Sequence, residues 1–313
     1  MDENYFGVVE DPRSEDEKAM DYKHSDVYGG VVEWKKKNIA DLKKYTKRYQ
    51  DGSLSCMGQG SAKGVETLIG KIMSAHPPYR SRNNYPDGGM WTQDLGDVWK
   101  KIGSNLEVDD QSQNAGESFL NRDITVPTPY KIKGYLQPNS KSIDEIAQAI
   151  ETWGHCMTIF HANGSEWNGK PVYNGSQVNF GHCICAVDYF LDENGVKCLW
   201  IEDSAAPTTS LDQEGHRIIT EEYLKWRCSS AIYFLGVNPL EIPYTFTKVL
   251  RVGSVGFDVK KLQAKLNTAG YILTVDGIFG KMTRQAVENL QGKHGLKVDG
   301  IVGSKTNGVL NLL

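Results

Sequence analysis

The chain has 313 residues and a formal net charge of −4 at pH 7, and such a length leaves room for about two domains. No apolar run reaches the ~18 residues of a membrane helix, and the opening Met-Asp-Glu-Asn lacks the features of a signal peptide. We therefore expect a protein that is made in the cytoplasm and does not insert into a membrane. No Lys/Arg run exceeds three residues, which argues against nucleic acid as a partner.

The basic residues concentrate near the C-terminus. Residues 248–313 contain ten Lys/Arg against four Asp/Glu, whereas the rest of the chain contains 25 against 35. A basic module on an acidic body suits a polyanionic ligand, such as a cell wall that bears phosphate polymers. The same lysines are equally consistent with an ordinary solvated helix surface.

The first segment that suggests chemistry surrounds Cys56. Residues 1–30 before it are charged, and the sequence leaves open whether they form an amphipathic helix, a pro-segment or a disordered arm. The spacing of Ala62, Val65 and Leu68 predicts a helix directly after the cysteine. The N-terminal end of a helix favours a thiolate, the form that a cysteine nucleophile requires. A cysteine in this position is, however, also common as a packing residue.

Paired glycines and a long polar segment follow. The run Asp87-Gly88-Gly89-Met90 precedes a helix that the spacing of Leu95, Val98 and Trp99 predicts. Residues 108–129 are rich in Asn, Gln and Ser and are predicted to form a long loop.

Two strands in the second half of the chain carry further candidate site residues. A capping-box pattern at 142–145 predicts a helix before them. Apolar residues around His182 predict a buried strand at 181–189. The Asp-Glu-Asn-Gly turn at 192–195 then predicts a hairpin with a second strand, which ends at Asp203.

Other residues compete for the same roles. His155 lies early in a predicted strand and is expected to be structural, whereas His161 at the end of that strand is a candidate for lining a cleft. Cys185 is an alternative nucleophile, but a cysteine in the middle of a strand lacks the helix dipole. Asp188 is an alternative partner for a histidine, and with His182 it is the nearest, weak candidate for a metal site. We expect no metal and no cofactor.

The six cysteines include no Cys-x-x-Cys pair, so a zinc knuckle is not expected. Free thiols that mostly serve as small core residues fit this pattern best.

A short pattern occurs twice near the C-terminus. It runs over 276–280 and is followed by Thr283, and it recurs over 299–303 followed by Thr306. In each copy, Asp-Gly predicts a tight turn, the next two apolar residues are expected to fill a small core, and the second glycine leads into a helix. Asp258 is the expected N-cap of a helix before the first copy.

The segment Leu250–Leu313 resembles the small three-helix peptidoglycan-binding domain. The stretch at 259–267, both Asp-Gly turns and the Ala-Val-x-x-x-Gln run at 286–291 carry the resemblance. It implies that bacterial peptidoglycan is the partner of this segment. The alternative is a generic helical cap or a dimerisation bundle.

Residues 30–235 resemble the papain-like cysteine peptidases. Gln50 stands six residues before Cys56, the segment at 181–189 resembles the strand that bears that family's histidine, and 199–204 resembles the strand that follows it. Further strands of the family are matched by Val31–Trp34 and Tyr130–Tyr135.

The resemblance also implies roles for individual residues. These are Cys56 as nucleophile, His182 as general acid and base, Asp203 as the residue that orients the imidazole, Gln50 as an oxyanion-hole donor together with the Cys56 backbone N–H, and Gly88 and Gly89 as the backbone that holds the substrate.

The chain departs from the family at four positions. Met57 stands where an indole usually follows the nucleophile, and Ser53 occupies the position of a bridging cysteine. Asp203 replaces the usual asparagine, and Ala205 replaces the tryptophan that shields that asparagine. An aspartate accepts the imidazole N–H and fixes its tautomer, as in serine hydrolases, so the departures affect specificity more than chemistry.

We therefore predict a papain-like α+β domain at 1–238 that includes the arm at 1–30, a linker at 239–247 and an all-α peptidoglycan-binding domain at 248–313. The predicted function is an endolysin-type cysteine hydrolase that acts at the bacterial cell wall and cleaves an amide bond of peptidoglycan through a thioester. A bacteriophage lysin released through a pore is favoured over a secreted autolysin. The sequence leaves open whether the bond lies in the stem peptide, the cross-bridge or the lactyl-alanine linkage.

Two other functions remain compatible with the sequence. One is a cysteine protease that cuts proteins and is anchored to the wall. The other is a wall-binding protein without activity on a papain scaffold.

Overall fold

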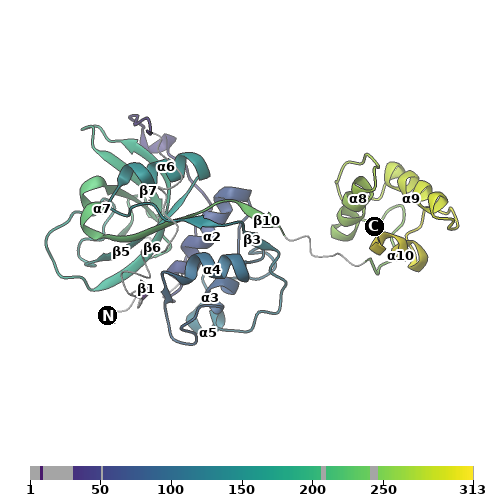
Figure 1. The fold of residues 1–313 in the computed structure, drawn as a ribbon, viewed down its shortest axis with the longest axis horizontal. Coiled ribbons are helices and arrows are strands. Elements are labelled where there is room, and N and C mark those ends of the chain that lie inside the picture. Colours follow the sequence, from purple (N-terminus) through teal and green to yellow (C-terminus); the bar gives the residue numbers. More distant parts are fainter. Residues whose placement is uncertain (1–7, 10–30, 51, 206–208, 240–245, 313) are drawn as a thin grey trace. The chain divides into compact units, whose positions relative to one another are not determined.

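The computed structural model describes residues 8–9, 31–50, 52–205, 209–239 and 246–312, and the chain divides into two compact units, 1–240 and 241–313, each described by itself (Figure 1). The predicted linker at 239–247 overlaps both units at its ends. Pro239 belongs to a strand of the first unit, and Phe246 is buried in the core of the second. Residues 240–245 and most of the predicted arm lie outside the described residues.

A six-stranded antiparallel sheet forms the centre of the first unit, in the order β4-β9-β5-β6-β7-β8. Its strands are β4 (Tyr135–Leu136), β5 (Cys156–Ala162), β6 (Phe180–Leu191), β7 (Lys197–Glu202), β8 (His216–Thr220) and β9 (Cys228–Phe234). β6 and β7 form the hairpin that the turn at 192–195 predicts. Gly195 in that turn has a φ of 78°, which glycine adopts without a steric penalty.

Helices cover both faces of this sheet (Figure 1). Within the described residues, the helices of the first unit are α2 (Cys56–Ile69), α3 (His76–Arg80), α4 (Asp94–Lys101), α5 (Glu117–Leu120), α6 (Ile143–Trp153) and α7 (Glu221–Arg227), with a 3-10 turn η2 (Ile39–Asp41). Val65 of α2 packs in one core with Cys183 and Cys185, while Ile184 packs in a second core with α6 and α7. Successive residues of β6 thus serve opposite cores, as strand geometry requires. The mixed helix and sheet architecture confirms the predicted α+β class.

The part of the first unit that the structure describes also contains two pairs of short strands. β1 (Val8–Val9) pairs in parallel with β2 (Met90–Trp91), and β3 (Tyr130–Ile132) pairs antiparallel with β10 (Val237–Pro239). The predicted long loop at 108–129 contains the short helix α5.

Two predicted strands differ in the structure. Val31–Trp34 does not form a strand, because Val31 is exposed and the Trp34 indole is anchored by a hydrogen bond to Asp144 (2.7 Å). The segment Tyr130–Tyr135 divides into β3 and the start of β4, which pair with different strands. Ser142 caps α6 as predicted, since its side chain accepts a hydrogen bond from the Glu145 backbone N–H (3.3 Å). The reciprocal bond of a capping box is not formed, because the Glu145 carboxylate accepts from the Asn139 N–H (2.8 Å).

The second unit is built from three helices, α8 (Phe257–Thr268), α9 (Lys281–Lys293) and α10 (Ser304–Leu312). Its core includes Leu262 from α8, Leu290 from α9 and Leu310 from α10, together with Phe279 and Val302 from the two repeats. The three-helix prediction is confirmed.

Each repeat closes around a buried glutamine. The Gln263 amide nitrogen donates to the Asp276 carboxylate (2.7 Å), and its oxygen accepts from the Gly277 N–H (2.9 Å). The Gln291 amide nitrogen donates to Asp299 (3.0 Å), and its oxygen accepts from the Gly300 N–H (2.9 Å). The same nitrogens also reach the threonines of the repeats, Thr283 and Thr306 (both 3.1 Å).

Two details of the predicted module are wrong. Asp258 lies in the first turn of α8 and pairs with Lys248 (2.7 Å), while Gly256 occupies the N-cap position. Only the second residue of each apolar pair fills the core, because Ile278 and Ile301 remain exposed.

Among the described residues, no helix combines the length and hydrophobicity needed to cross a membrane. All six cysteines are buried free thiols, as predicted.

Candidate active site

Cys56 is the first residue of α2 and is buried. The Ser55 side chain does not cap this helix and instead contacts the Ser53 hydroxyl (Oγ–Oγ 2.7 Å). The N–H groups of a first helical turn lack partners within the helix, so this end of α2 presents donors beside the thiol. Burial raises the pKa of the Cys56 thiol to about 12, and a backbone hydrogen bond from Cys183 acts in the opposite direction. A thiolate at Cys56 therefore needs a nearby cation in addition to the helix dipole.

His182 lies next to Cys183 near the start of β6 and is fully buried. α2 packs closely on this part of the strand, since a side chain at Gly60 would lie 3.2 Å from the Cys183 sulfur. The strand that bears the histidine and the helix that begins with Cys56 are thus in direct contact.

Asp203 follows the last residue of β7 and meets His182 across the sheet. The β6–β7 register pairs Cys185 with Glu202, which brings Asp203 alongside the beginning of β6. The distance between His182 Nε2 and Asp203 Oδ1 is 2.5 Å, and both side chains are fully buried. Asp203 thus contacts the imidazole through Nε2 and not through Nδ1.

Three further donors hold the Asp203 carboxylate. Oδ1 accepts from the Ala205 backbone N–H (2.8 Å), and Oδ2 accepts from the Trp167 indole (2.9 Å) and from Arg217 Nε (2.5 Å). Burial opposes ionisation of Asp203, but the charges of His182 and Arg217 outweigh it and hold the pKa of this carboxyl well below its usual range. Asp203 is therefore an anion with a fixed orientation.

Gln50 connects the segment before α2 to the residue after Asp203. Its side-chain oxygen accepts from the Ser204 hydroxyl (2.9 Å), and its backbone N–H donates to the Ser204 carbonyl (3.0 Å). One hydrogen of its amide nitrogen is directed to the Ser53 carbonyl (2.9 Å). An amide nitrogen has two hydrogens, so the second is available for an oxyanion.

Gly88 and Gly89 lie beside the segment that leads to Cys56. A side chain at Gly88 would collide with Leu54, at 2.2 Å, and Gly89 has a φ of 78°. The Gly89 N–H donates to the Tyr79 hydroxyl (3.1 Å). Directly after the two glycines, the chain forms β2, and the edge of β2 pairs with β1. β1 also lies against β6, the strand of His182.

The competing residues of the sequence have other partners. Both ring nitrogens of His155 are hydrogen-bonded, one to the Trp153 carbonyl and one to the Phe234 N–H, and burial lowers the pKa of His155 to about 4. Asp188 forms an ion pair with Lys37 (2.7 Å), so it neither orients His182 nor forms a metal site with it.

Two further candidates are less suited to catalysis. Burial raises the pKa of Cys185 well above its usual range, and the neighbouring Glu202 raises it further. His161 is half-buried in β5.

Among the described residues, one cluster has the composition of a metal site: the ligand atoms of Asp212, Glu214 and His216 lie within 4.8 Å of one another. His216 Nδ1 is already hydrogen-bonded to Asp212 (2.7 Å), and Glu214 is exposed. An internal hydrogen bond accounts for this cluster without an ion.

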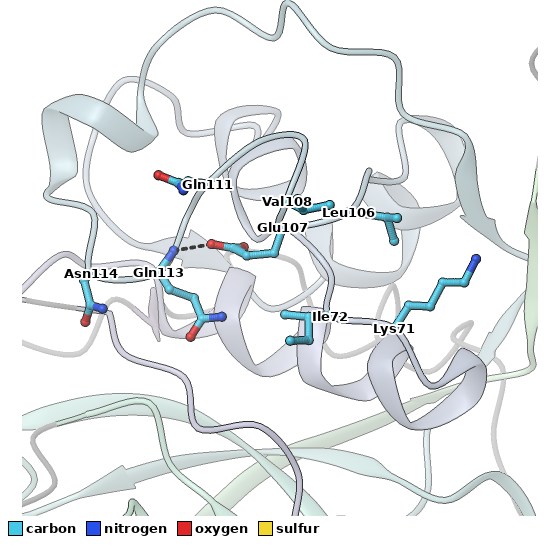
Figure 2. A pocket seen from close by; sticks show the side chains of 8 residues that line it. All are labelled: Lys71, Ile72, Leu106, Glu107, Val108, Gln111, Gln113 and Asn114. Atoms are coloured by element: carbon cyan, nitrogen blue, oxygen red, sulfur yellow. Dashed lines mark hydrogen bonds between the residues drawn. The ribbon is translucent and has the colours of Figure 1, made fainter. Parts of the chain in front are cut away.

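A cavity of about 740 Å³ opens elsewhere in the first unit (Figure 2). Its lining comprises Lys71, Ile72, Leu106, Glu107, Val108, Gln111, Gln113 and Asn114. Lys71 and Ile72 follow the C-terminal end of the 14-residue helix α2, about 20 Å from Cys56 at 1.5 Å per residue. Glu107 is turned inward and accepts from the Gln113 backbone N–H (2.8 Å; Figure 2). The cavity contains none of the predicted site residues.

Sequence reasoning missed Trp167 and Arg217. The Trp167 ring packs edge-on against the His182 imidazole (centroids 5.8 Å apart, interplanar angle 86°). Neither residue lies in a motif with a fixed spacing to Asp203. The one available signal was Arg217 itself, a charged residue within the apolar strand β8.

Comparisons with known proteins match the two units separately. Residues 256–310 match the family of the peptidoglycan binding domain. The chain is 42% identical to the spore cortex-lytic enzyme of Bacillus subtilis (strain 168) over 76 residues, which are 24% of this chain and 25% of that protein. The chain thus spans about a quarter of the length of the curated relatives it matches.

Two of the matching solved structures cover most of the chain. The crystal structure of xylellain, a cysteine protease from Xylella fastidiosa, matches 76% of this chain and 98% of its own, with a TM-score of 0.59 and 15% identity. The digestive procathepsin L2 proteinase of Tenebrio molitor larval midgut matches 61% of this chain and 64% of its own, with a TM-score of 0.51 and 16% identity. The chain therefore combines a papain-like fold with a peptidoglycan-binding domain.

Proposed function

We propose that this chain, in which a papain-like fold is joined to a peptidoglycan-binding domain, hydrolyses an amide bond of peptidoglycan with Cys56 as the nucleophile. The observation that carries the proposal is the buried His182–Asp203 pair (2.5 Å), which lies on a strand packed against the thiol-bearing end of α2. A thiol, an oriented imidazole and the N–H groups at the start of a helix are the parts that acyl transfer requires.

The reaction begins with transfer of the Cys56 proton to His182 Nδ1. The imidazolium provides the cation that a buried thiolate needs, and Asp203 keeps the ring in place through Nε2. The thiolate attacks the amide carbonyl, and the oxyanion receives hydrogen bonds from Gln50 and from the first turn of α2. His182 then protonates the leaving amine, and a thioester with Cys56 remains.

Water completes the cycle. His182 Nδ1 removes a proton from the water molecule as it attacks the thioester carbonyl. Collapse of the second oxyanion releases a carboxylic acid and returns the thiol. The chain supplies every proton transfer in this scheme, so the proposal includes no metal and no cofactor.

The second unit supports peptidoglycan as the substrate. A domain that holds the enzyme on an insoluble polymer raises its effective concentration at bonds within reach, without contributing to the chemistry. The matched relative is named as a spore cortex-lytic enzyme, which agrees with a wall substrate. The first unit resembles a protease, so cleavage of proteins by a wall-anchored enzyme is the second candidate.

The test uses purified peptidoglycan with the wild type, Cys56→Ala and the control Cys198→Ala, which replaces another buried cysteine. We expect the wild type and the control to release fragments, while Cys56→Ala binds the wall and releases at least about 10⁴-fold less. Mass spectrometry of the fragments identifies the bond. Release by Cys56→Ala would refute the mechanism, and cleavage of casein without release from walls would favour the protease.

The same assay, applied to a chain that begins at residue 10, tests whether the substrate binds in the place of β1. β1 pairs with the edge that follows Gly88 and Gly89 and lies against β6, so an extended substrate competes with it for this position. We expect the shortened chain to show a lower KM with little change in kcat. An unchanged KM would show that substrate binds elsewhere.

A further inference from the structure

Arg217 lies in β8 and is fully buried, although arginine rarely is. All three of its nitrogens have partners. Nε donates to Asp203 Oδ2 (2.5 Å), one terminal nitrogen donates to the Thr209 carbonyl (2.7 Å), and the other donates to the Thr209 hydroxyl (2.8 Å). The guanidinium also lies over the Trp167 ring, 5.2 Å from its centroid. The position of this charge is therefore fixed.

The two oxygens of Asp203 serve different groups. Oδ1 contacts His182 and Oδ2 contacts Arg217, so the carboxylate lies between an imidazole and a permanent cation. A buried carboxylate with no other partner would hold a proton on the neighbouring imidazole strongly, because nearby opposite charges favour the charged form. A cation at the same carboxylate cancels most of this effect, since the pair has no net charge.

We propose that Arg217 is a positioning residue that neutralises Asp203, so that the Asp203–Arg217 pair acts on His182 as an uncharged hydrogen-bond acceptor. This inference rests on the proposed function. It also accounts for the aspartate at position 203. Papain-like peptidases usually have a neutral asparagine there, and an aspartate paired with a buried arginine supplies the same hydrogen-bond acceptor without a net charge.

Other charged groups lie near Asp203, and several of them contact one another. Lys47, Arg48, Lys63, Glu202 and Glu214 line a cavity of about 10 Å³ together with Asp203. Lys63 binds Glu202 (2.7 Å), and Arg48 lies 3.8 Å from Glu66. Towards His182, the titratable group on α2 is Cys56. Within the described part of the chain, Arg217 is thus the arginine in direct contact with Asp203.

The test compares the pH dependence of Arg217→Met, Asp203→Asn and the double variant with that of the wild type, all as full chains. One readout is kcat/KM on peptidoglycan. The other is the rate at which iodoacetamide alkylates Cys56, measured by mass spectrometry with Cys56→Ala as the blank. The second readout needs no knowledge of the substrate.

The two single variants should shift the profiles in opposite directions. Without Arg217, the uncompensated carboxylate should move both the acidic and the basic limb of each pH–rate profile to higher pH by about one unit. Asp203→Asn should move both limbs to lower pH by about the same amount. The double variant should return to within a few tenths of a unit of the wild type and recover at least about tenfold of the kcat/KM that Asp203→Asn loses.

A purely structural role for Arg217 would lower all rates without moving the limbs, and that result would overturn the inference. Arg217→Lys keeps the charge and guards against misfolding of Arg217→Met; we expect its limbs to match those of the wild type. If iodoacetamide alkylates Cys56 but walls are not cleaved, peptidoglycan is refuted as the substrate, and the alkylation profiles still decide the role of Arg217. If Cys56 reacts no faster than in the unfolded chain, both proposals fail.

Discussion

The two units are each organised around a buried polar side chain, but the two kinds of centre differ. In the second unit, Gln263 and Gln291 are neutral amides whose partners all lie within the next 20 residues, and the arrangement occurs twice. In the first unit, Asp203 is a single charged group whose partners come from β6, β8 and the loop that follows β5.

The difference shows how stability and chemistry are divided in this chain. A neutral amide with its hydrogen bonds satisfied stabilises a fold at little electrostatic cost. A buried carboxylate requires compensating charges, and those charges in turn set where a proton resides on His182. The predictions below test whether the charged centre controls reaction rates while the neutral centre controls folding.

The largest effect expected in this comparison of the two centres concerns Gln50, which belongs to the charged centre through Ser204. Gln50→Ala removes one oxyanion donor, and we expect kcat to fall by about 10²–10³-fold. The change is measured on peptidoglycan, with wall binding as the control. Because the second unit is untouched, binding should be unchanged. A loss of binding equal to the loss of kcat would contradict the division of roles.

The next effect concerns Gln291 in the neutral centre. Gln291→Leu leaves the buried N–H of Gly300 without its acceptor and removes the donor to the Thr306 hydroxyl, so we expect about 3 kcal/mol less stability for the second unit. Calorimetry and sedimentation with walls measure this, and Gln285→Leu is the control because Gln285 is exposed on the same helix. Alkylation of Cys56 should continue at the wild-type rate, and its loss would link the two units.

A smaller effect is expected for Trp167. Trp167→Phe keeps a ring against His182 but removes the indole hydrogen bond to Asp203. We expect kcat/KM to fall by about tenfold, the value of one hydrogen bond to a charged group. Trp153→Phe is the control, because the Trp153 indole nitrogen has no hydrogen bond within the described part of the chain. Equal losses in both variants would mean that Trp167 contributes only packing.

The smallest effect concerns His216, which stacks on Trp200 and contacts Asp212 and Glu202. Burial lowers the pKa of His216, but the two carboxylates outweigh burial, and the pKa is raised. The folded-state pKa is then above the unfolded value of about 6.5, so this stabilisation is complete below that pH and is lost as the pH rises through the folded-state pKa.

Urea unfolding of the wild type and His216→Gln between pH 5 and 9 tests this sign. The wild type should be more stable by less than about 1 kcal/mol at low pH, and the two proteins should converge at high pH. The second unit is the internal reference, because its buried glutamines do not titrate. A gap that widens with pH would show that His216 is neutral in the folded state.

The sequence by itself determined the parts of this protein that depend on short-range patterns. The doubled Asp-Gly motif predicts the second unit because each copy forms its own turn and helix start within a few residues. The helix that starts at Cys56, the Ser142 cap of α6 and the hairpin that joins β6 to β7 follow from local spacing in the same way.

The family resemblance supplied Cys56, His182 and Asp203 as candidates, and the structure brings His182 and Asp203 into contact. Their role in catalysis stays a prediction.

Only the tertiary structure decided what surrounds the carboxylate. Trp167 and Arg217 reach Asp203 from loops and strands whose lengths are not fixed by any motif. The exposure of Ile278 and the position of β1 against β2 were equally beyond the sequence. The physical reason is the same in each case: hydrophobic period and turn chemistry report the local backbone, whereas a buried charge selects its partners through space.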